Sequence, residues 1–543
     1  MNKDLISFQP QPDRYIHFRL EIRPPIARIQ LNVQEEKGVR SDYKLKLNSY
    51  DIGVDIELAD IVERLRFEHP EVSVVCIESA RQDIFCAGAN IYMLASSSHS
   101  HKVNFCKFTN ETRLQIEEAT ERSGQYYVAS LKGGAAGGGY ELAMACAEIH
   151  LIDDRKSSVS LPEAPYLGVL PGTGGLTRLV DKRRVRRDLA DIFCTLPEGA
   201  RGRRALEWRL VDFVHAPSVY DTELNRRLEQ LAEQHPIRAE RGIELSPIQF
   251  RREGDTLDYK FVKLQIEGRR ANLTIAAPPE EELEVGEDPC QRGGGWYPIE
   301  LWRELRDAIL QLRFNYEEVG LVCLYTEGSL ESVLRLDENL HARRGHWLIK
   351  EILLLQARVL KMVDVSAKSF FSFVVPGSCF GGSLLELALA SDRIYMLDEE
   401  GSAVGVSPLN GGMLLMGHGL SRLENRFYQD EEAVRRILEL QGQAIPSQQA
   451  FELGLVTELM DDIDWEDEVR IAIEERLSLS PDALTGLEAN LRFVGKETME
   501  SRIFGRLSAW QNWIFTRPNA TGQKGALSAY GKEFSPEFDW TRT

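Results

Sequence analysis

The chain has 543 residues, 43% of them hydrophobic and 27% charged, which is the composition of a folded protein with two or more domains and not of a largely disordered chain. Its 84 acidic and 65 basic residues give a net charge of −19, so general binding to nucleic acid or to anionic membranes is not expected. The eight cysteines show no CxxC pair and no zinc-ligand spacing, and no membrane-spanning apolar stretch is present. We therefore expect free thiols, no bound metal, no membrane partner and a cytoplasmic location.

The first predicted elements are two short strands around a turn, in the segment from Tyr15 to Val33. A helix over residues 56–67 and a buried, β-branched strand over residues 72–78 come next. Apolar strands that alternate with helices are typical of crossover units, so the predicted fold class is α/β.

The segment Phe85-Cys-Ala-Gly-Ala-Asn90 follows that strand and precedes another predicted helix. Its small residues Ala87, Gly88 and Ala89 would let a ligand approach the main chain. We take Ala87 and Gly88 as candidate substrate-binding residues.

A second small-residue segment runs from Gly133 to Gly139 and contains five glycines in seven residues. A helix that begins there would offer unpaired N–H groups, so the amide of Gly138 could stabilise an oxyanion, with Gly137 beside the substrate. Glu141 would lie on nearly the same face one turn further on. Taken alone, these glycines could equally serve tight helix packing, and Glu141 could cap its own helix. The dinucleotide-binding pattern GxGxxG is absent.

Glu163 stands in the segment Ser160-Leu-Pro-Glu-Ala-Pro165, and Pro171-Gly-Thr-Gly-Gly175 follows it. Apolar neighbours and two prolines would raise the pKa of this carboxyl group, and a second glutamate nearby would divide the roles of acid and base. An exposed loop carboxylate is the alternative.

A repeat becomes visible in the second half of the chain. The segment from Tyr15 matches the segment from Tyr259 at an offset of 244 residues, and the segment from Leu65 matches the segment from Leu312 at an offset of 247 residues. Two further matches at similar offsets, around the glycines and near Val211, predict the duplication of one α/β unit.

The second copy lacks the chemical residues of the first. It keeps Gly381 and Gly382 but has Leu385 where Glu141 stands and Ser407 near the position of Glu163. Glu386 is adjacent, yet one residue along a helix rotates a side chain by about 100°. We expect a noncatalytic copy, with a different reaction at Glu386 as the alternative.

The predicted regions are a catalytic domain over residues 1–255, a degenerate domain over residues 256–470 and a helical region with a tail over residues 471–543. We expect the last helices, which include the candidate substrate-binding residue Asn490, to cover the site of the first copy. The basic run 182–187 could contact phosphate groups of a ligand or could be a solvated helix face.

In this order, the segments FCAGAN, GGGYELA, LPEA and PGTGG resemble the crotonase (enoyl-CoA hydratase/isomerase) superfamily. The resemblance implies tandem duplicated crotonase-like domains with a helical C-terminal region, and coenzyme A thioesters as substrates. It places the oxyanion-hole amides at Ala89 and Gly138 and the acid/base pair at Glu141 and Glu163. It also implies no cofactor other than the coenzyme A of the substrate, no metal, and a homodimer or other homo-oligomer.

Residues 170–214 and 482–520 are more specifically similar to ring-opening lyases of this superfamily that act in aerobic benzoate degradation. That likeness implies attack by two waters on 2,3-epoxybenzoyl-CoA, which gives 3,4-dehydroadipyl-CoA semialdehyde and formate. An enoyl-CoA hydratase or isomerase of another pathway and a noncatalytic acyl-CoA-binding scaffold are the alternatives. The sequence leaves open which glutamate is the acid and which is the base.

Overall fold

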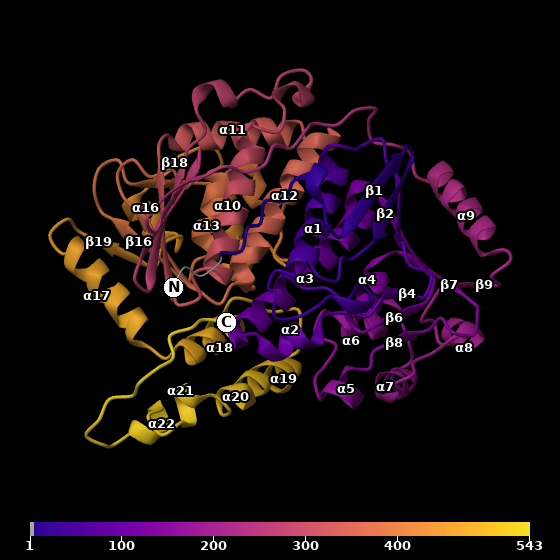
Figure 1. Cartoon of the computed structure of the whole chain (residues 1–543). Helices are drawn as coiled ribbons and strands as arrows, with labels where there is room; N and C mark the ends of the chain where they lie inside the picture. Colours follow the sequence, from indigo (N-terminus) through magenta and orange to yellow (C-terminus); the bar gives the residue numbers. More distant parts are fainter. Residues whose placement is uncertain (1–4) are drawn as a thin grey trace. The chain divides into compact units, whose positions relative to one another are not determined.

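The computed structural model describes residues 5–543, and the chain divides into two compact units, Met1–Pro247 and Ile248–Thr543 (Figure 1). Both units consist of a largely parallel sheet with helices, which confirms the predicted α/β class. None of the helices in the described part of the chain is long and apolar enough to cross a membrane. All eight cysteines are free thiols.

The first unit has a six-stranded sheet in the order β1-β2-β3-β5-β7-β9 and a three-stranded parallel sheet in the order β4-β6-β8. The hairpin β1–β2 is antiparallel, and the other neighbours in the main sheet are parallel. The strands are β1 (Phe18–Arg23), β2 (Ile26–Leu31), β3 (Val74–Ser79), β4 (Ile84–Cys86), β5 (Tyr126–Leu131), β6 (Gly134–Ala136), β7 (Glu148–Ile152), β8 (Val159–Ser160) and β9 (Phe213–His215).

The helices of the first unit connect these parallel strands. They are α1 (Ile52–Phe67), α2 (Ile91–Ser96), α3 (His99–Glu118), α4 (Gly138–Ala145), α5 (Glu163–Leu167), α6 (Gly175–Thr177), α7 (Arg187–Thr195), α8 (Gly202–Glu207) and α9 (Tyr220–Gln234). Helix α1 begins where Asp51 accepts hydrogen bonds from the amides of Gly53 and Val54. Leucines of α9 are buried against β3 and β5, so this helix covers one face of the sheet.

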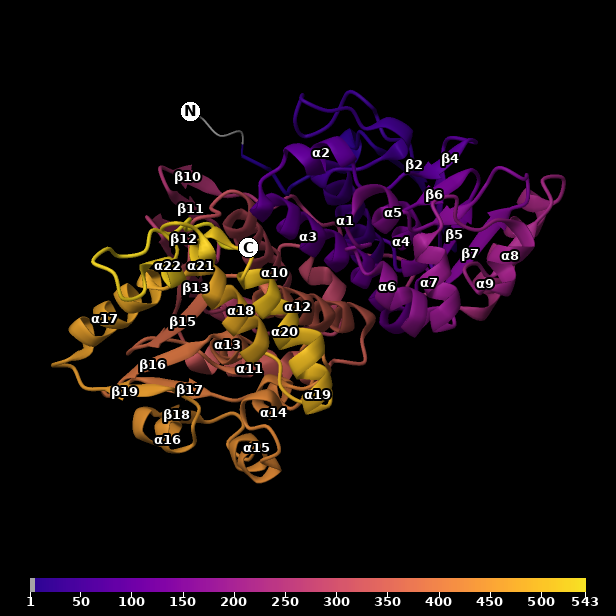
Figure 2. The same ribbon diagram turned by 90° about the horizontal axis from the view of Figure 1, so that it is seen from below.

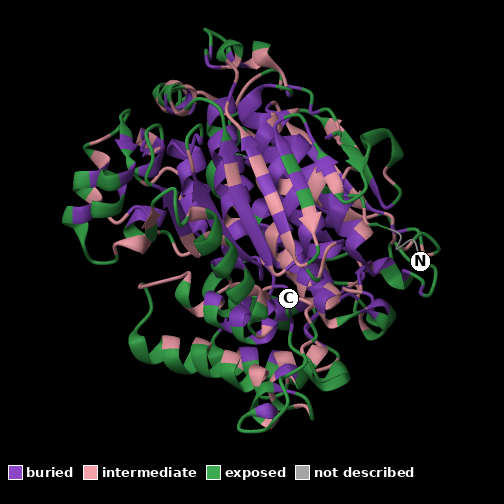
Figure 3. Ribbon diagram, turned by 90° about the vertical axis from the view of Figure 1, so that its left-hand side faces the viewer, coloured by how far each residue is buried: buried purple, intermediate pink, exposed green. Residues whose placement is uncertain are grey.

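The second unit has an eight-stranded sheet in the order β10-β11-β12-β13-β14-β15-β16-β19, in which β10 to β13 are antiparallel and the rest parallel. The strands are β10 (Arg251–Glu253), β11 (Thr256–Asp258), β12 (Val262–Glu267), β13 (Arg270–Ala276), β14 (Leu321–Glu327), β15 (Ser369–Val374), β16 (Arg393–Leu397) and β19 (Glu458–Met460), with a separate hairpin of β17 (Ala403–Gly405) and β18 (Ala444–Pro446). In Figure 3, buried residues concentrate in this sheet.

The helices of the second unit extend to the end of the chain. They are α10 (Tyr297–Phe314), α11 (Leu330–Ala342), α12 (Trp347–Val365), α13 (Gly382–Ala390), α14 (Arg422–Arg426), α15 (Glu431–Leu438), α16 (Ser447–Glu452), α17 (Trp465–Ser478), α18 (Pro481–Leu491), α19 (Met499–Arg502), α20 (Ser508–Ile514), α21 (Pro518–Thr521) and α22 (Ala526–Ala529). Helix α18 packs against α20 and α21 within this unit (Figure 2).

The unit boundary differs from the boundaries expected from the sequence. Residue 255 lies in the turn between β10 and β11, and both strands belong to the second unit. Residue 471 lies inside α17, whose Ala472 and Ile473 are buried in one cluster with Leu321 and Phe371 of the sheet. Because that apolar contact ties α17 to the sheet, the C-terminal helices belong to the second unit.

Candidate active site

The glycine-rich segment ends in the N-terminus of α4. Strand β6 leads to Gly137, whose positive φ of 53° turns the chain, and the helix starts at Gly138 as the sequence predicts. The N–H groups of Gly138 and Ala89 have no hydrogen-bond acceptor within residues 5–543. Both N–H groups are therefore open to a ligand oxygen.

Gly88 brings the Ala89 segment to the start of this helix. Its φ is +86°, and a Cβ at this position would lie 2.7 Å from the Gly138 nitrogen and 2.8 Å from the Ala136 carbonyl oxygen. A side chain would push the two segments apart, so glycine is required here. The residue that follows is Ala89, so the two amides proposed for the oxyanion hole belong to adjacent segments. Ala87 instead donates its N–H to the Leu47 carbonyl group at 3.1 Å.

Glu141 lies on α4 one turn beyond Gly138 and is only 2% exposed. Its carboxylate accepts hydrogen bonds from the amide of Gly175 at 2.7 Å, from the amide of Thr173 at 3.1 Å and from the Thr173 hydroxyl group. A Cβ at Gly175 would lie 2.6 Å from the same carboxylate, so the Pro171–Gly175 segment is shaped to hold it. Burial raises the pKa of Glu141, while these hydrogen bonds favour its ionised form.

Glu163 is the first residue of the short helix α5 and is partly buried, not an exposed loop residue. Its Oε2 atom is buried and, within residues 5–543, has no hydrogen-bond partner. Burial, and to a smaller extent the negative charge of Glu141, raises the pKa of Glu163 to about 7. A Cβ at Gly137 would lie 2.7 Å from Glu163 Oε1. The structure therefore brings both glutamates to the start of α4, where Glu163 holds a proton more readily than an ordinary glutamate.

The environment of these groups defines what the site can do. A protonated Glu163 can donate a proton, an ionised Glu141 can accept one, and two open amides can stabilise a negative oxygen. The clamp formed by Thr173 and Gly175 could not be predicted from the sequence, because the PGTGG segment contains no acidic or basic group. Tyr50 was not predicted either, although the repeat pairs this residue with a tyrosine of the second copy.

Two other candidates have different surroundings. Asn490 lies on α18 in the second unit and donates its side-chain N–H to the Gly486 carbonyl group at 2.7 Å. The basic run is partly engaged inside the first unit: Lys182 contacts Glu117 at 2.8 Å and Arg183 contacts Asp212 at 2.8 Å. Arg184, Arg186 and Arg187 are exposed, so the run is largely solvated, but residues 183–186 lie between helical segments and do not form a helix face.

The start of helix α13, which the sequence repeat matches to the start of α4, is occupied by side chains of the second unit. Helix α13 begins at Gly382, and Asp337 accepts hydrogen bonds from the Ser383 amide at 2.6 Å and from the Ser407 hydroxyl group at 3.0 Å. Asp337 is 1% exposed, and a Cβ at Gly382 would collide with its carboxylate. The place of a ligand oxygen is thus filled by a carboxylate of the chain.

Glu386 of the second unit is also unavailable for chemistry. It is 1% exposed, accepts a hydrogen bond from Asn410 at 2.7 Å and forms an ion pair with Arg422 at 3.1 Å. Arg422 is in turn paired with Asp364 at 2.6 Å. This buried network argues against the alternative of a separate reaction at Glu386.

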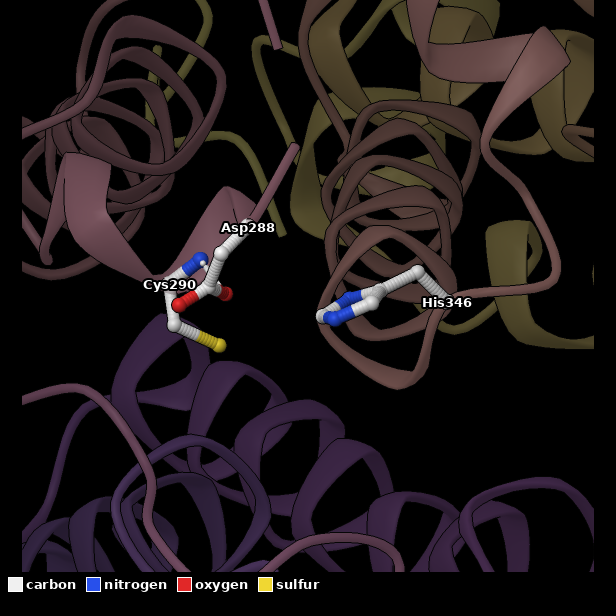
Figure 4. A group of neighbouring side chains, drawn as sticks. All are labelled: Asp288, Cys290 and His346. Atoms are coloured by element: carbon white, nitrogen blue, oxygen red, sulfur yellow. Dashed lines mark hydrogen bonds between the residues drawn. The ribbon is translucent and has the colours of Figure 1, made fainter. Parts of the chain in front are cut away.

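One group in the described part of the chain has the ligand types of a metal site. Asp288, Cys290 and His346 of the second unit face one another, and their ligand atoms lie within 4.8 Å (Figure 4). Two of them already accept amide hydrogen bonds that cap helices: Asp288 from Cys290 at 3.0 Å, and His346 Nδ1 from Leu348 at 3.2 Å. A capping role accounts for both side chains.

The chain is similar to several known proteins. The family model for enoyl-CoA hydratase/isomerase matches residues 42–243. The benzoyl-CoA-dihydrodiol lyase of Aromatoleum evansii is 52% identical over 99% of this chain and 98% of its own length. An enoyl-CoA hydratase structure from Geobacillus kaustophilus is 32% identical and covers 40% of this chain and 75% of its own, with a TM-score of 0.36. One from Bacillus anthracis is 25% identical, covers 40% and 76%, and has a TM-score of 0.34.

Proposed function

This chain belongs to the enoyl-CoA hydratase/isomerase (crotonase) superfamily and, within it, to the family of benzoyl-CoA-dihydrodiol lyase, and from that premise we propose its reaction. The enzyme opens the ring of 2,3-epoxybenzoyl-CoA with two waters and releases 3,4-dehydroadipyl-CoA semialdehyde and formate, in aerobic benzoate degradation. The observation that carries this proposal is the 52% identity over nearly the whole of both chains.

We assign the acid role to Glu163 and the base role to Glu141. Glu163 has a pKa of about 7 and a buried oxygen without a partner, so it can protonate the epoxide oxygen as the C–O bond breaks. Glu141 receives three hydrogen bonds that favour its carboxylate form, so it can deprotonate the attacking water.

The amides of Ala89 and Gly138 would stabilise the negative charge that develops on the thioester oxygen when the carbon–carbon bond breaks. Preorganised N–H donors suit this role because they need no rearrangement during the reaction. Ala87, Gly88 and Gly137 would let the thioester approach the main chain closely. The reaction as proposed needs no metal and no cofactor besides the coenzyme A of the substrate.

We further propose that the second unit is a duplicated crotonase-like domain that has lost catalysis. Its hairpin followed by parallel strands, and its glycine at a helix start, match the first unit. The superfamily resemblance leads us to propose a homo-oligomer as well, which the measured mass in solution would test.

Mass spectrometry of the products from 2,3-epoxybenzoyl-CoA tests the proposed reaction. We expect equimolar formate and a ring-opened CoA semialdehyde, with no hydration of crotonyl-CoA. Hydration of crotonyl-CoA without formate would instead identify an enoyl-CoA hydratase. Binding of acyl-CoA without turnover of either thioester would identify a binding protein.

A further inference from the structure

Tyr50 connects both halves of the proposed oxyanion hole. Its main chain pairs with the segment that carries Ala89: the Tyr50 N–H donates to the Gly88 carbonyl group at 3.0 Å, and the Asn90 N–H donates to the Tyr50 carbonyl group at 2.8 Å. These two hydrogen bonds flank Ala89 and leave its own N–H open. The backbone of Tyr50 therefore fixes the first of the two proposed donors.

The side chain of Tyr50 reaches Gly138, the residue that carries the second proposed donor. A Cβ at Gly138 would collide with the Tyr50 hydroxyl oxygen, so this hydroxyl group touches the start of α4. The residue is 3% exposed, and its hydroxyl group has no hydrogen-bond partner within residues 5–543. A buried hydroxyl group without a partner is unfavourable, because it has given up its hydrogen bonds to water. This cost is removed if a ligand oxygen accepts the hydrogen bond.

The repeat contains a tyrosine with a different environment at the matching position. Helices α1 and α10 end at Phe67 and Phe314, and the same offset of 247 residues places Tyr50 opposite Tyr297. The Tyr297 hydroxyl group donates to the Ala276 carbonyl group at 2.8 Å. In the second unit, where the helix start is closed, the tyrosine hydroxyl group thus has a hydrogen-bond partner within the chain. In the first unit, which contains the glutamate pair, the tyrosine hydroxyl group has no such partner among residues 5–543.

We propose that the Tyr50 hydroxyl group is a third hydrogen-bond donor to the thioester oxygen held by the amides of Ala89 and Gly138. The inference rests on the proposed function, since it needs a thioester in this site. Three converging donors would hold the developing enolate oxygen more tightly than the two amides alone.

The surroundings of Tyr50 keep its hydroxyl group protonated and therefore a donor. Burial is the main cause that raises the pKa of Tyr50 well above its usual value. The Arg113 guanidinium group stacks over the ring at 5.2 Å and acts in the opposite direction, and the nearby carboxylates of Asp55 and Glu141 raise the pKa further. A neutral phenol cannot act as a base here, so its role is hydrogen-bond donation.

The test compares Tyr50→Phe with the matched variant Tyr297→Phe in the full chain. With 2,3-epoxybenzoyl-CoA, we expect Tyr50→Phe to lower kcat for formate release about 10- to 100-fold and to change KM less than about threefold. Tyr297→Phe removes a buried hydroxyl group outside the site and should leave kcat within about twofold.

A second measurement does not depend on turnover. Benzoyl-CoA labelled with carbon-13 at the thioester carbonyl reports donor strength through its infrared stretching frequency when bound. We expect Tyr50→Phe to raise this frequency toward that of free benzoyl-CoA and Tyr297→Phe to leave it unchanged. If Tyr50→Phe fails to fold, difluorotyrosine at position 50 keeps the ring and strengthens the donor, so the frequency should fall further.

The outcomes separate the two proposals. Wild-type protein that releases no formate refutes the proposed reaction, while the carbonyl frequency still decides the role of Tyr50. Wild-type turnover together with unchanged kcat and unchanged carbonyl frequency in Tyr50→Phe overturns the inference. An unchanged frequency with difluorotyrosine also overturns it.

Discussion

The starts of α4 and α13 differ in how the chain enters the helix and in the side chains around it: φ is +53° at Gly137, before α4, and +46° at Gly382, the first residue of α13. Gly138 and Gly382 both open a helix after a glycine. At Gly138 the open amide adjoins two glutamates and an unpartnered tyrosine hydroxyl group, whereas at Gly382 the carboxylate of Asp337 fills the space. The difference therefore includes both the turn into the helix and the side chains that distant segments place beside it.

The glutamates of the two units also differ in their partners. Within residues 5–543, the hydrogen bonds to the Glu141 carboxylate all come from uncharged donors, the amides of Thr173 and Gly175 and the Thr173 hydroxyl group. Glu386 is neutralised by the buried cation of Arg422. A carboxylate that is already paired with a guanidinium group in the interior is a poor proton acceptor, because the ion pair would be broken. The buried ion pair of Glu386 supports the proposal that the second unit does not carry out catalysis.

The largest effect expected from this comparison is on stability. Arg422→Met removes the cation shared by Asp364 and Glu386 and should lower the free energy of unfolding by about 3–5 kcal/mol, because two buried carboxylates lose their partner. Denaturant unfolding measures it. Arg435→Met, which breaks exposed ion pairs, is the matched control and should cost less than about 1 kcal/mol. Equal stability of both variants would contradict the buried network.

The next effect separates the two glutamates proposed for catalysis from Glu386 of the second unit. Glu141→Gln and Glu163→Gln should each lower kcat for formate release by about 10²-fold or more, because each loses a group that transfers a proton. Glu386→Gln should leave kcat near the wild-type value in the folded protein. Steady-state kinetics at a temperature where all variants are folded provides the measurement, and near-native turnover of both first-unit variants would discard this site.

The smallest effect concerns pH and sharpens the assignment of roles. Burial raises the pKa of Glu163 to about 7, so the carboxyl group is mostly protonated below that pH and mostly ionised above it. If Glu163 is the acid, kcat/KM should fall about tenfold per pH unit above pH 7. In Glu163→Gln this limb should vanish from the residual activity. A profile that instead rises through pH 7 would give Glu163 the role of the base.

Much of the first unit could be predicted from its sequence because the relevant signals are local. The glycines predict the start of α4 at Gly138, and Glu141, three residues further along the helix, is then expected one turn away on nearly the same face. The apolar strands that alternate with helices predict the α/β class. The unit boundary could not be placed at the right residue, because the hairpin β10–β11 joins the second sheet by pairing with β12, and α17 packs on strands that lie far earlier in the chain.

The sequence by itself determined the class of the fold, the repeat and the identity of the residues gathered at the glycine-rich helix start. Only the tertiary structure decided that burial raises the pKa of Glu163 to about 7, that Thr173 and Gly175 clamp Glu141, and that Asp337 closes the second helix start. The physical reason is that a pKa and an open hydrogen-bond donor depend on burial and on partners far away in the chain. Those partners meet only after the chain has folded.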